Sequence, residues 1–264
     1  MTALGLLAAI PVVMWLAQSV WLRCAAQPLR ARINPPDLPE RARRFNRIVT
    51  YSCFVALILL FPLTRGRSPL AYFLELLPMK DAARPALFGA AAAILYLALL
   101  HLAWVVTDNV RFRMRQSAGQ LVSKLAGVPL TAILAAGTEE LIFRGIVLRD
   151  LLDWLPGEGA LLLGVAVFAG AHYVRSVKRY WTFGGHVALG LLLCTAFVLT
   201  GSLWLSLGLH AGGILVLAAL RPLVRYTGPR WLVGASIFPY AGVVGILALL
   251  LLTWNIWLEF GLTQ

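Results

Sequence analysis

The sequence predicts an all-α protein, a polytopic transmembrane helical bundle with about eight spans. Of its 264 residues, 60% are hydrophobic and only 13% are charged, which is unlike the composition of a soluble domain. The apolar residues form long continuous runs, and a helix needs about 20 such residues to cross a hydrocarbon core about 30 Å thick. The runs do not alternate with period two, as the strands of a membrane β-barrel would.

Eight apolar runs follow one another along the chain. We place them near residues 2–22, 48–64, 86–107, 128–152, 158–180, 184–200, 203–220 and 236–258. No basic residue precedes the first run and arginines follow it, so we interpret it as a retained span and not as a signal peptide. Within one membrane unit we distinguish N-terminal helices with basic loops (1–120), a core (121–220) and a C-terminal helix (221–264).

Most of the 23 lysine and arginine residues lie in the connections after the first, third, fifth and seventh spans. Basic loops favour the cytoplasm, so we expect these connections inside and both termini outside. The basic residues that give the net charge of +12 then orient the helices and contact anionic lipids. Each basic residue near such a surface contributes about 1 kcal/mol of attraction. No soluble segment is long enough for a nucleic-acid-binding domain, so we expect no nucleic acid partner.

Three charged residues stand inside the fourth run: Glu139, Glu140 and Arg144. A charge at the centre of a membrane helix costs about 2.5–3.5 kcal/mol on insertion scales, so such residues usually mark a functional site. Residues four apart share a helix face, so Glu140 and Arg144 can pair while Glu139 points about 100° away. Two ionised carboxylates this close repel each other, which leaves Glu139 as the better proton carrier. The alternative is a structural polar cluster that braces helices.

Two histidines, His172 and His210, lie among small residues in the fifth and seventh runs. Small side chains let membrane helices approach closely, so both rings can reach Glu139. A glutamate beside an imidazole can activate water, because the carboxylate accepts the proton while the histidine holds the water or donates to the leaving group. The other histidine can stabilise negative charge on a carbonyl oxygen. We interpret His101 and His186 as interfacial.

The depths of these residues in the membrane must agree if they share a site. At a rise of 1.5 Å per residue, Glu139 lies about 17 Å and His210 about 15 Å from the cytoplasmic ends of their spans. His172 reaches a similar depth if its helix continues to about Tyr180, followed by a turn at Gly184-Gly185. Three basic side chains would then extend to the headgroups: Arg175, Lys178 and Arg179. A helix that ended before them would count against a shared site.

Three motifs in three spans match those of a known family. They are EExxxR at Glu139, Glu140 and Arg144, FxxxH at Phe168 and His172, and the histidine of a third motif at His210. On these residues the chain resembles the CPBP family of intramembrane glutamic proteases, which includes type II CAAX prenyl endopeptidases and bacteriocin-processing and immunity proteins. The resemblance covers about residues 128–220. It implies a catalytic core in 121–220 and a metal-independent protease without a cofactor.

The resemblance also implies a role for each residue. Glu139 would be the base that activates water with the help of His172, and His210 would help to form the oxyanion site. The supporting residues would be Glu140, Arg144 and Phe168. The third motif commonly has an asparagine four residues after its histidine, whereas this chain has Ile214, which cannot donate a hydrogen bond. Removal of one oxyanion donor costs about 2.7–4 kcal/mol, so either another donor replaces it or cleavage is slow or lost.

Metal and cofactor alternatives explain less of the pattern. Glu139, His172 and His210 could ligate zinc, and the two histidines could be axial haem ligands. The family resemblance argues against zinc, and haem leaves the three charges of the fourth run unexplained. The cysteines are odd in number and widely spaced, without a CxxC pair, so we expect neither a disulfide nor a metal site from them: Cys24, Cys53 and Cys194.

The expected function is therefore that of an intramembrane endopeptidase acting on a membrane-anchored peptide or protein. The richness in Ala, Leu and Arg suggests a bacterial source, and hence an integral protein of the bacterial inner membrane. The alternative is a non-catalytic membrane protein of the same fold, such as an immunity or scaffold factor. Ile214 is the feature that favours this alternative.

Overall fold

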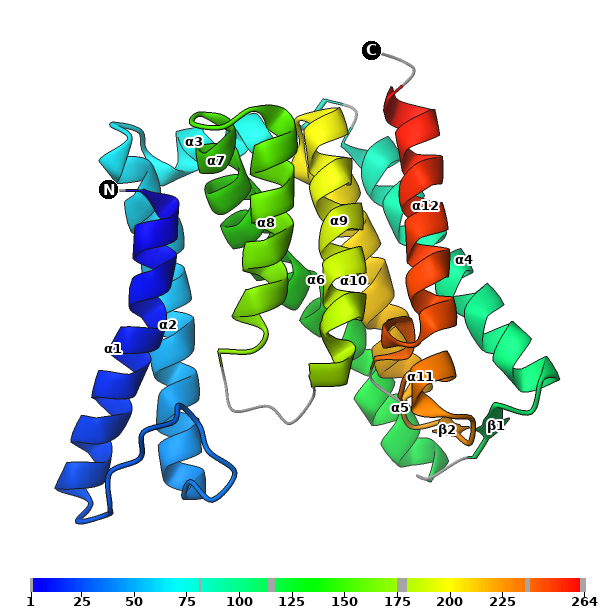
Figure 1. The fold of residues 1–264 in the computed structure, drawn as a ribbon, viewed down its shortest axis with the longest axis horizontal. Coiled ribbons are helices and arrows are strands. Elements are labelled where there is room, and N and C mark those ends of the chain that lie inside the picture. The colour runs from blue at the N-terminus through cyan, green and yellow to red at the C-terminus, as the bar shows by residue number, and fades with distance from the viewer. Residues whose placement is uncertain (1, 81, 114–116, 175–179, 236–237, 262–264) are drawn as a thin grey trace.

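The computed structural model describes residues 2–80, 82–113, 117–174, 180–235 and 238–261, and it is a bundle of helices (Figure 1). In this part of the chain seven helical segments are long and apolar enough to cross a membrane, and the helix Gly157–Ala171 is apolar but shorter. The prediction of a helical membrane bundle is confirmed, and the seven long segments together with this shorter helix compare with the predicted number of about eight spans. The chain is an integral, multi-pass membrane protein.

The long helices match most of the predicted runs. Their bounds are α1 (Ala3–Cys24), α2 (Glu40–Thr64), α4 (Ala83–Val106), α6 (Val128–Glu140), α8 (Gly157–Ala171), α9 (Phe183–Thr200), α10 (Leu203–Leu220) and α12 (Val243–Gly261). Helices α1 and α2 pack side by side, α9 contacts both α8 and α12, and α10 contacts α4, α6 and α9. The start of α1 and the end of α12 lie at the same end of the bundle (Figure 1).

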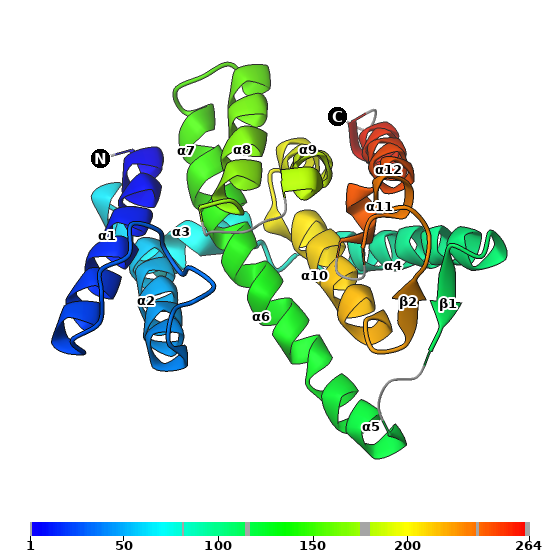
Figure 2. The same ribbon diagram turned by 60° about the horizontal axis from the view of Figure 1, so that its bottom comes forward.

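Helix α6 does not stop at the two glutamates. It continues through a π-helical segment, η1 (Leu141–Leu148), into the short helix α7 (Arg149–Leu152). π-helical segments are rare and frequently occur at functional sites. Before α6 lies the short helix α5 (Ala118–Ala126), and Figure 2 shows α5 and α6 as one long rod whose α5 end lies away from the other helices.

The close contact between α4 and α10 depends on a glycine in α10. A Cβ atom at Gly208 of α10 would lie 2.1 Å from the carbonyl oxygen of Ala86 in α4, closer than any real contact. Small residues permit this close approach of membrane helices. The two backbones therefore touch two residues before His210.

Several short elements join the long helices. A two-stranded antiparallel ribbon pairs β1 (Val110–Phe112) with β2 (Val224–Tyr226), with Val110 opposite Tyr226. The others are α3 (Pro69–Leu76), the 3₁₀ turn η2 (Tyr180–Thr182), α11 (Arg230–Val233) and the 3₁₀ turn η3 (Pro239–Ala241). The turn η3 occupies the beginning of the predicted last span, so α12 starts at Val243 and not near residue 236.

The predicted helix 158–180 is wrong at its end. Helix α8 ends at Ala171, where the amides of His172 and Tyr173 bond to the carbonyls three residues before them. The 15 residues of α8 span about 22 Å, less than a hydrocarbon core of about 30 Å. Because α8 is too short to cross the hydrocarbon core, His172 at its end lies inside the membrane, at the depth of the site. The predicted positions of Arg175, Lys178 and Arg179 lie outside the described residues, and Gly184-Gly185 belongs to α9 instead of forming a turn.

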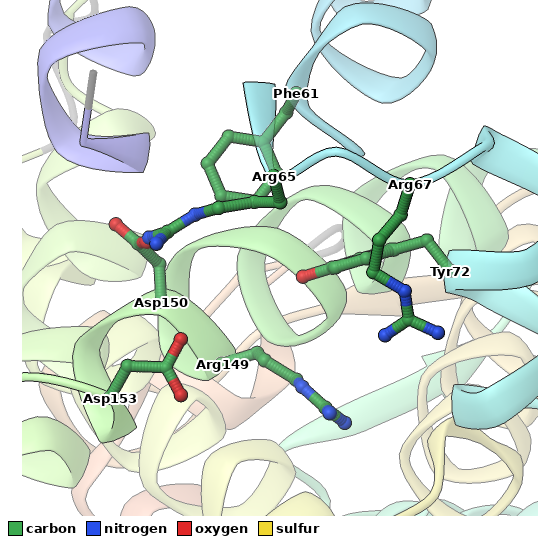
Figure 3. Close-up of a pocket in the computed structure, with 7 residues that line it drawn as sticks. All are labelled: Phe61, Arg65, Arg67, Tyr72, Arg149, Asp150 and Asp153. Carbon is green, nitrogen blue, oxygen red and sulfur yellow. The ribbon is translucent and has the colours of Figure 1, made fainter. Parts of the chain in front are cut away.

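A cavity of about 130 Å³ lies where α2, α3 and α7 meet, at the end of the bundle where α1 begins (Figures 1 and 3). Its lining residues are Phe61, Arg65, Arg67, Tyr72, Arg149, Asp150 and Asp153. Asp150 pairs with Arg65 and accepts a hydrogen bond of 2.8 Å from the backbone of Ala3. The Arg67 guanidinium binds Glu75 and thereby lowers the pKa of that carboxyl. The arginines here meet carboxylates, so we interpret the cluster as a connection between α1, α2, α3 and α7.

Candidate functional site

The two neighbouring glutamates lie where α6 passes into η1, and their surroundings differ. The side chain of Glu140 is 1% exposed, whereas that of Glu139 is 34% exposed. The ion pair expected for Glu140 is present, with 3.1 Å between its Oε1 and Nη1 of Arg144. Arg144 is completely buried, so Glu140 supplies the negative charge that makes this burial tolerable.

Glu140 also binds His210 of α10. Nδ1 of His210 lies 2.7 Å from the same Oε1 atom that Arg144 contacts. A carboxylate ion only accepts hydrogen bonds, so Nδ1 carries the proton and donates it. This bond fixes the imidazole ring and directs its other nitrogen, Nε2, away from Glu140.

Glu139 lies between two histidines that come from different elements. Its Oε2 atom is 3.8 Å from Nε2 of His210 and 3.8 Å from Nε2 of His172, which follows the end of α8. The three residues that the sequence singled out for chemistry therefore converge from α6, α8 and α10. The early end of α8 does not separate them.

The ring of His172 is oriented by Phe168, the first residue of its motif. Nδ1 of His172 lies 2.8 Å from the carbonyl oxygen of Phe168, which can only accept, so Nδ1 carries a proton. In the neutral ring Nε2 is then an acceptor, and it faces Glu139. The Phe168 ring packs edge-to-face against the His172 ring, with 4.8 Å between the ring centroids. The guanidinium carbon of Arg144 lies 4.3 Å from the centroid of the Phe168 ring. Phe168 thus connects the buried ion pair to His172.

The rings of His101 and His186, which we interpret as interfacial, are both buried in protein. His101 binds the Leu97 carbonyl and the hydroxyl of Tyr226 beside the β ribbon. The His186 ring lies 4.5 Å from that of His172, centroid to centroid. Sequence reasoning missed this neighbour because nothing in the spacing of two histidines on separate helices indicates which rings meet.

Ile214 lies one helical turn after His210 on α10 and is partly buried. Its side chain offers no hydrogen bond, so it adds no donor to the site. Within the described ranges, no three or more His, Cys, Asp or Glu side chains form a group that could hold a metal ion.

The comparisons with known proteins point to the same segment. Residues 121–216 match the sequence model of a family described as type II CAAX prenyl endopeptidase Rce1-like. No curated protein and no solved structure matches the chain. The matched segment contains all six site residues discussed above: Glu139, Glu140, Arg144, Phe168, His172 and His210.

The match agrees with the resemblance that the three motifs indicate, and it supports a peptidase that acts on a membrane-associated peptide or protein. It covers the part of the chain in which the two glutamates and the two histidines converge. Residues 121–216 therefore resemble the Rce1-like family of type II CAAX prenyl endopeptidases.

Proposed function

We propose that this protein is a metal-independent intramembrane endopeptidase that uses Glu139 and His172 to activate water and His210 to stabilise the oxyanion. One observation carries the proposal: a partly exposed carboxylate lies 3.8 Å from the free nitrogens of two imidazole rings supplied by other helices. The family match to endopeptidases favours this function over the non-catalytic alternative.

In the first step, a water molecule beside Glu139 loses a proton to the carboxylate while His172 holds it in the orientation needed for attack. Nε2 of His172 acts as a hydrogen-bond acceptor for this water, because its Nδ1 proton is donated to Phe168. The water oxygen attacks the carbonyl carbon of the scissile bond. Glu139 then passes the proton to the leaving amine as the carbon–nitrogen bond breaks.

His210 serves the oxygen of the tetrahedral intermediate. Its Nδ1 proton is donated to Glu140, so Nε2 can donate to an oxyanion only when the ring carries both protons. The resulting imidazolium, held by a buried carboxylate, is a preorganised positive charge of the kind that stabilises such intermediates. Glu140, Arg144 and Phe168 act as supporting residues that hold the two rings.

The proposed substrate is a membrane-anchored peptide or protein, and the proposed location is a bacterial inner membrane. Under the predicted topology, the basic connections after α1, α4, α8 and α10 face the cytoplasm and contact anionic lipids. In Figure 1 the end of α8, which His172 follows, and the start of α9 lie on the same side of the bundle as the connections after α1 and α10. The site then receives its substrate from the cytoplasmic half of the membrane.

The test is cleavage of membrane-anchored peptides by the purified protein in lipid nanodiscs. Glu139→Gln removes the base and keeps the shape, so we expect kcat to fall by at least about 100-fold, the lower range of general-base contributions. Glu158→Gln is the matched control, because this carboxylate lies at the opposite end of α8 and is exposed. A chelator should leave cleavage unchanged. Cleavage that survives Glu139→Gln would refute the mechanism.

A further inference from the structure

His172 lacks the support that a continuing helix would give. Helix α8 ends at Ala171, and His172 lies at its C-cap with its side chain 28% exposed. Within α8, the ring is held by Phe168, through the hydrogen bond to its carbonyl oxygen and the edge-to-face ring contact described above. A general-base partner must hold its nitrogen within a fraction of an ångström, so a second element has to restrain this ring.

The second element is the start of α9, which presents His186. The two imidazole rings lie 4.5 Å apart with an angle of 37° between their planes, and His186 is itself only 3% exposed. No contact of His186 with Glu139 or His210 is among those described, so its effect on the site passes through His172.

The His186 ring is restrained on both of its nitrogens. Nδ1 lies 3.0 Å from the carbonyl oxygen of Thr182, one helical turn earlier, so this nitrogen is the donor. Nε2 is then the acceptor for the hydroxyl of Tyr240, 3.5 Å away in η3. Tyr173, the residue after His172, has its hydroxyl 3.2 Å from Nδ1 of His186 and 2.7 Å from Oγ1 of Thr182. The segment that carries His172 is therefore bound to α9 by a second contact.

The close seating of η3 on α9 supports this arrangement independently. A Cβ atom at Gly185 would lie 2.7 Å from Cα of Ala241 and 3.0 Å from the Tyr240 ring. Only glycine permits the turn that carries Tyr240 to approach so closely. The residue next to His186 is thus fitted to keep the tyrosine within reach of the ring.

We propose that His186, held by Thr182 and Tyr240, is a positioning residue that fixes the His172 ring with its Nε2 atom toward Glu139. This proposal rests on the proposed function for its effect on cleavage, but the position of the His172 ring can be measured without any cleavage. His186 is not itself a catalytic residue, because it touches His172 and not the reacting atoms.

The activity-independent test is the rate at which diethyl pyrocarbonate modifies His172, measured by mass spectrometry on the protein in nanodiscs. His172 is the most exposed of the four histidines, so it reports on its own restraint. We expect His186→Ala to raise the modification rate of His172 severalfold. The matched control is His101→Ala, since His101 has the same kind of bonds, to the Leu97 carbonyl and to the Tyr226 hydroxyl. This control should leave the modification rate of His172 unchanged.

Kinetics on the same variants supply the second readout. A misplaced general-base partner lowers kcat by about 10- to 100-fold while KM stays near its original value. His186→Phe keeps an aromatic ring against His172 and should recover part of the loss, and His101→Ala should retain full kcat. If His186→Ala does not fold, His186→Phe still gives a loss intermediate between none and that of His172→Ala.

The outcomes separate the two proposals. An unchanged modification rate at His172 in a folded His186 variant, or a loss of kcat equal to that of His101→Ala, would overturn the positioning role. Cleavage that persists in Glu139→Gln would overturn the proposed function alone, because the modification rate of His172 would still report on His186.

Discussion

At the scale of single residues, adjacency in sequence places two identical side chains in different chemical roles. Glu140 is enclosed and shared by Arg144 and His210, whereas Glu139 is open to the space that the two Nε2 atoms face. The helical rotation of about 100° per residue produces this division. The exposed carboxylate can exchange protons, and the enclosed one maintains the charges around it.

We predict that Glu140→Gln destabilises the protein, because it leaves the fully buried Arg144 without its counter-charge. Breaking a buried pair by removing one partner costs about 3–5 kcal/mol. Thermal unfolding in detergent should show a clearly lower midpoint, whereas Glu139→Gln, on a partly exposed carboxylate, should change stability by less than about 0.5 kcal/mol. Equal midpoints for the two variants would contradict this account of the ion pair.

A second prediction concerns Ile214→Asn, which places a hydrogen-bond donor one turn after His210 on the same helix face. One additional oxyanion donor is worth about 100-fold or more in kcat when it is well aligned. We expect faster turnover with little change in KM, measured on the best peptide substrate. Ile214→Val serves as the control that changes size without adding a donor. Turnover that stays constant would mean that another group already fills this role.

At the scale of elements, the position of His210 depends on how closely α10 lies against α4. Gly208→Ala would bring Cβ into the Ala86 carbonyl oxygen, and overpacking of this kind costs about 1–3 kcal/mol. We predict a lower unfolding midpoint and a reduced kcat, because the helix must move where it carries His210. Gly213→Ala is the matched control on the same helix, since a Cβ there has nothing within 4 Å. Similar losses in both variants would contradict the argument.

The long helices were predictable because a continuous apolar run of membrane length has one structural solution. The same reasoning could not place α3, α5 or the β1–β2 ribbon, which are short and owe their form to local caps or to a partner distant in sequence. The end of α8 was missed for a physical reason. Apolarity sets where a helix can continue, but the i→i+3 bonds after Ala171 set where it stops.

Some residues of the candidate site were likewise predictable from the sequence, and others were not. Glu139, His172 and His210 stood out because charged or titratable groups in apolar runs are costly. His186 and Tyr240 did not, because their significance lies in contacts between α9 and η3 that no sequence spacing shows. The sequence therefore indicates the residues that could take part in the chemistry, but not the residues that position them.

At the scale of the whole molecule, the described parts of the basic connections after α1, α4 and α10 lie at one end of the bundle, opposite the start of α1 and the end of α12 (Figure 1). We predict that Cys24, which is exposed at the end of α1, reacts with a membrane-impermeant maleimide only from the cytoplasmic face. Vesicles of known orientation provide the measurement. Cys194 is buried and should stay unlabelled from either side, and labelling of Cys24 from the outer face would invert the topology.

The passage of α6 into η1 has a consequence for how this sequence can change over time. A single-residue deletion between Val128 and Glu139 would rotate Glu139, Glu140 and Arg144 together by about 100° relative to the start of α6, so Glu140 would take the exposed position of Glu139 and Leu141 the buried position of Glu140. Substitutions on the lipid-facing side of α6 leave this register intact. We therefore expect relatives to vary in the residue types on the lipid-facing side of this helix but to keep its length, because an insertion or deletion would turn all three charged residues away from His172 and His210.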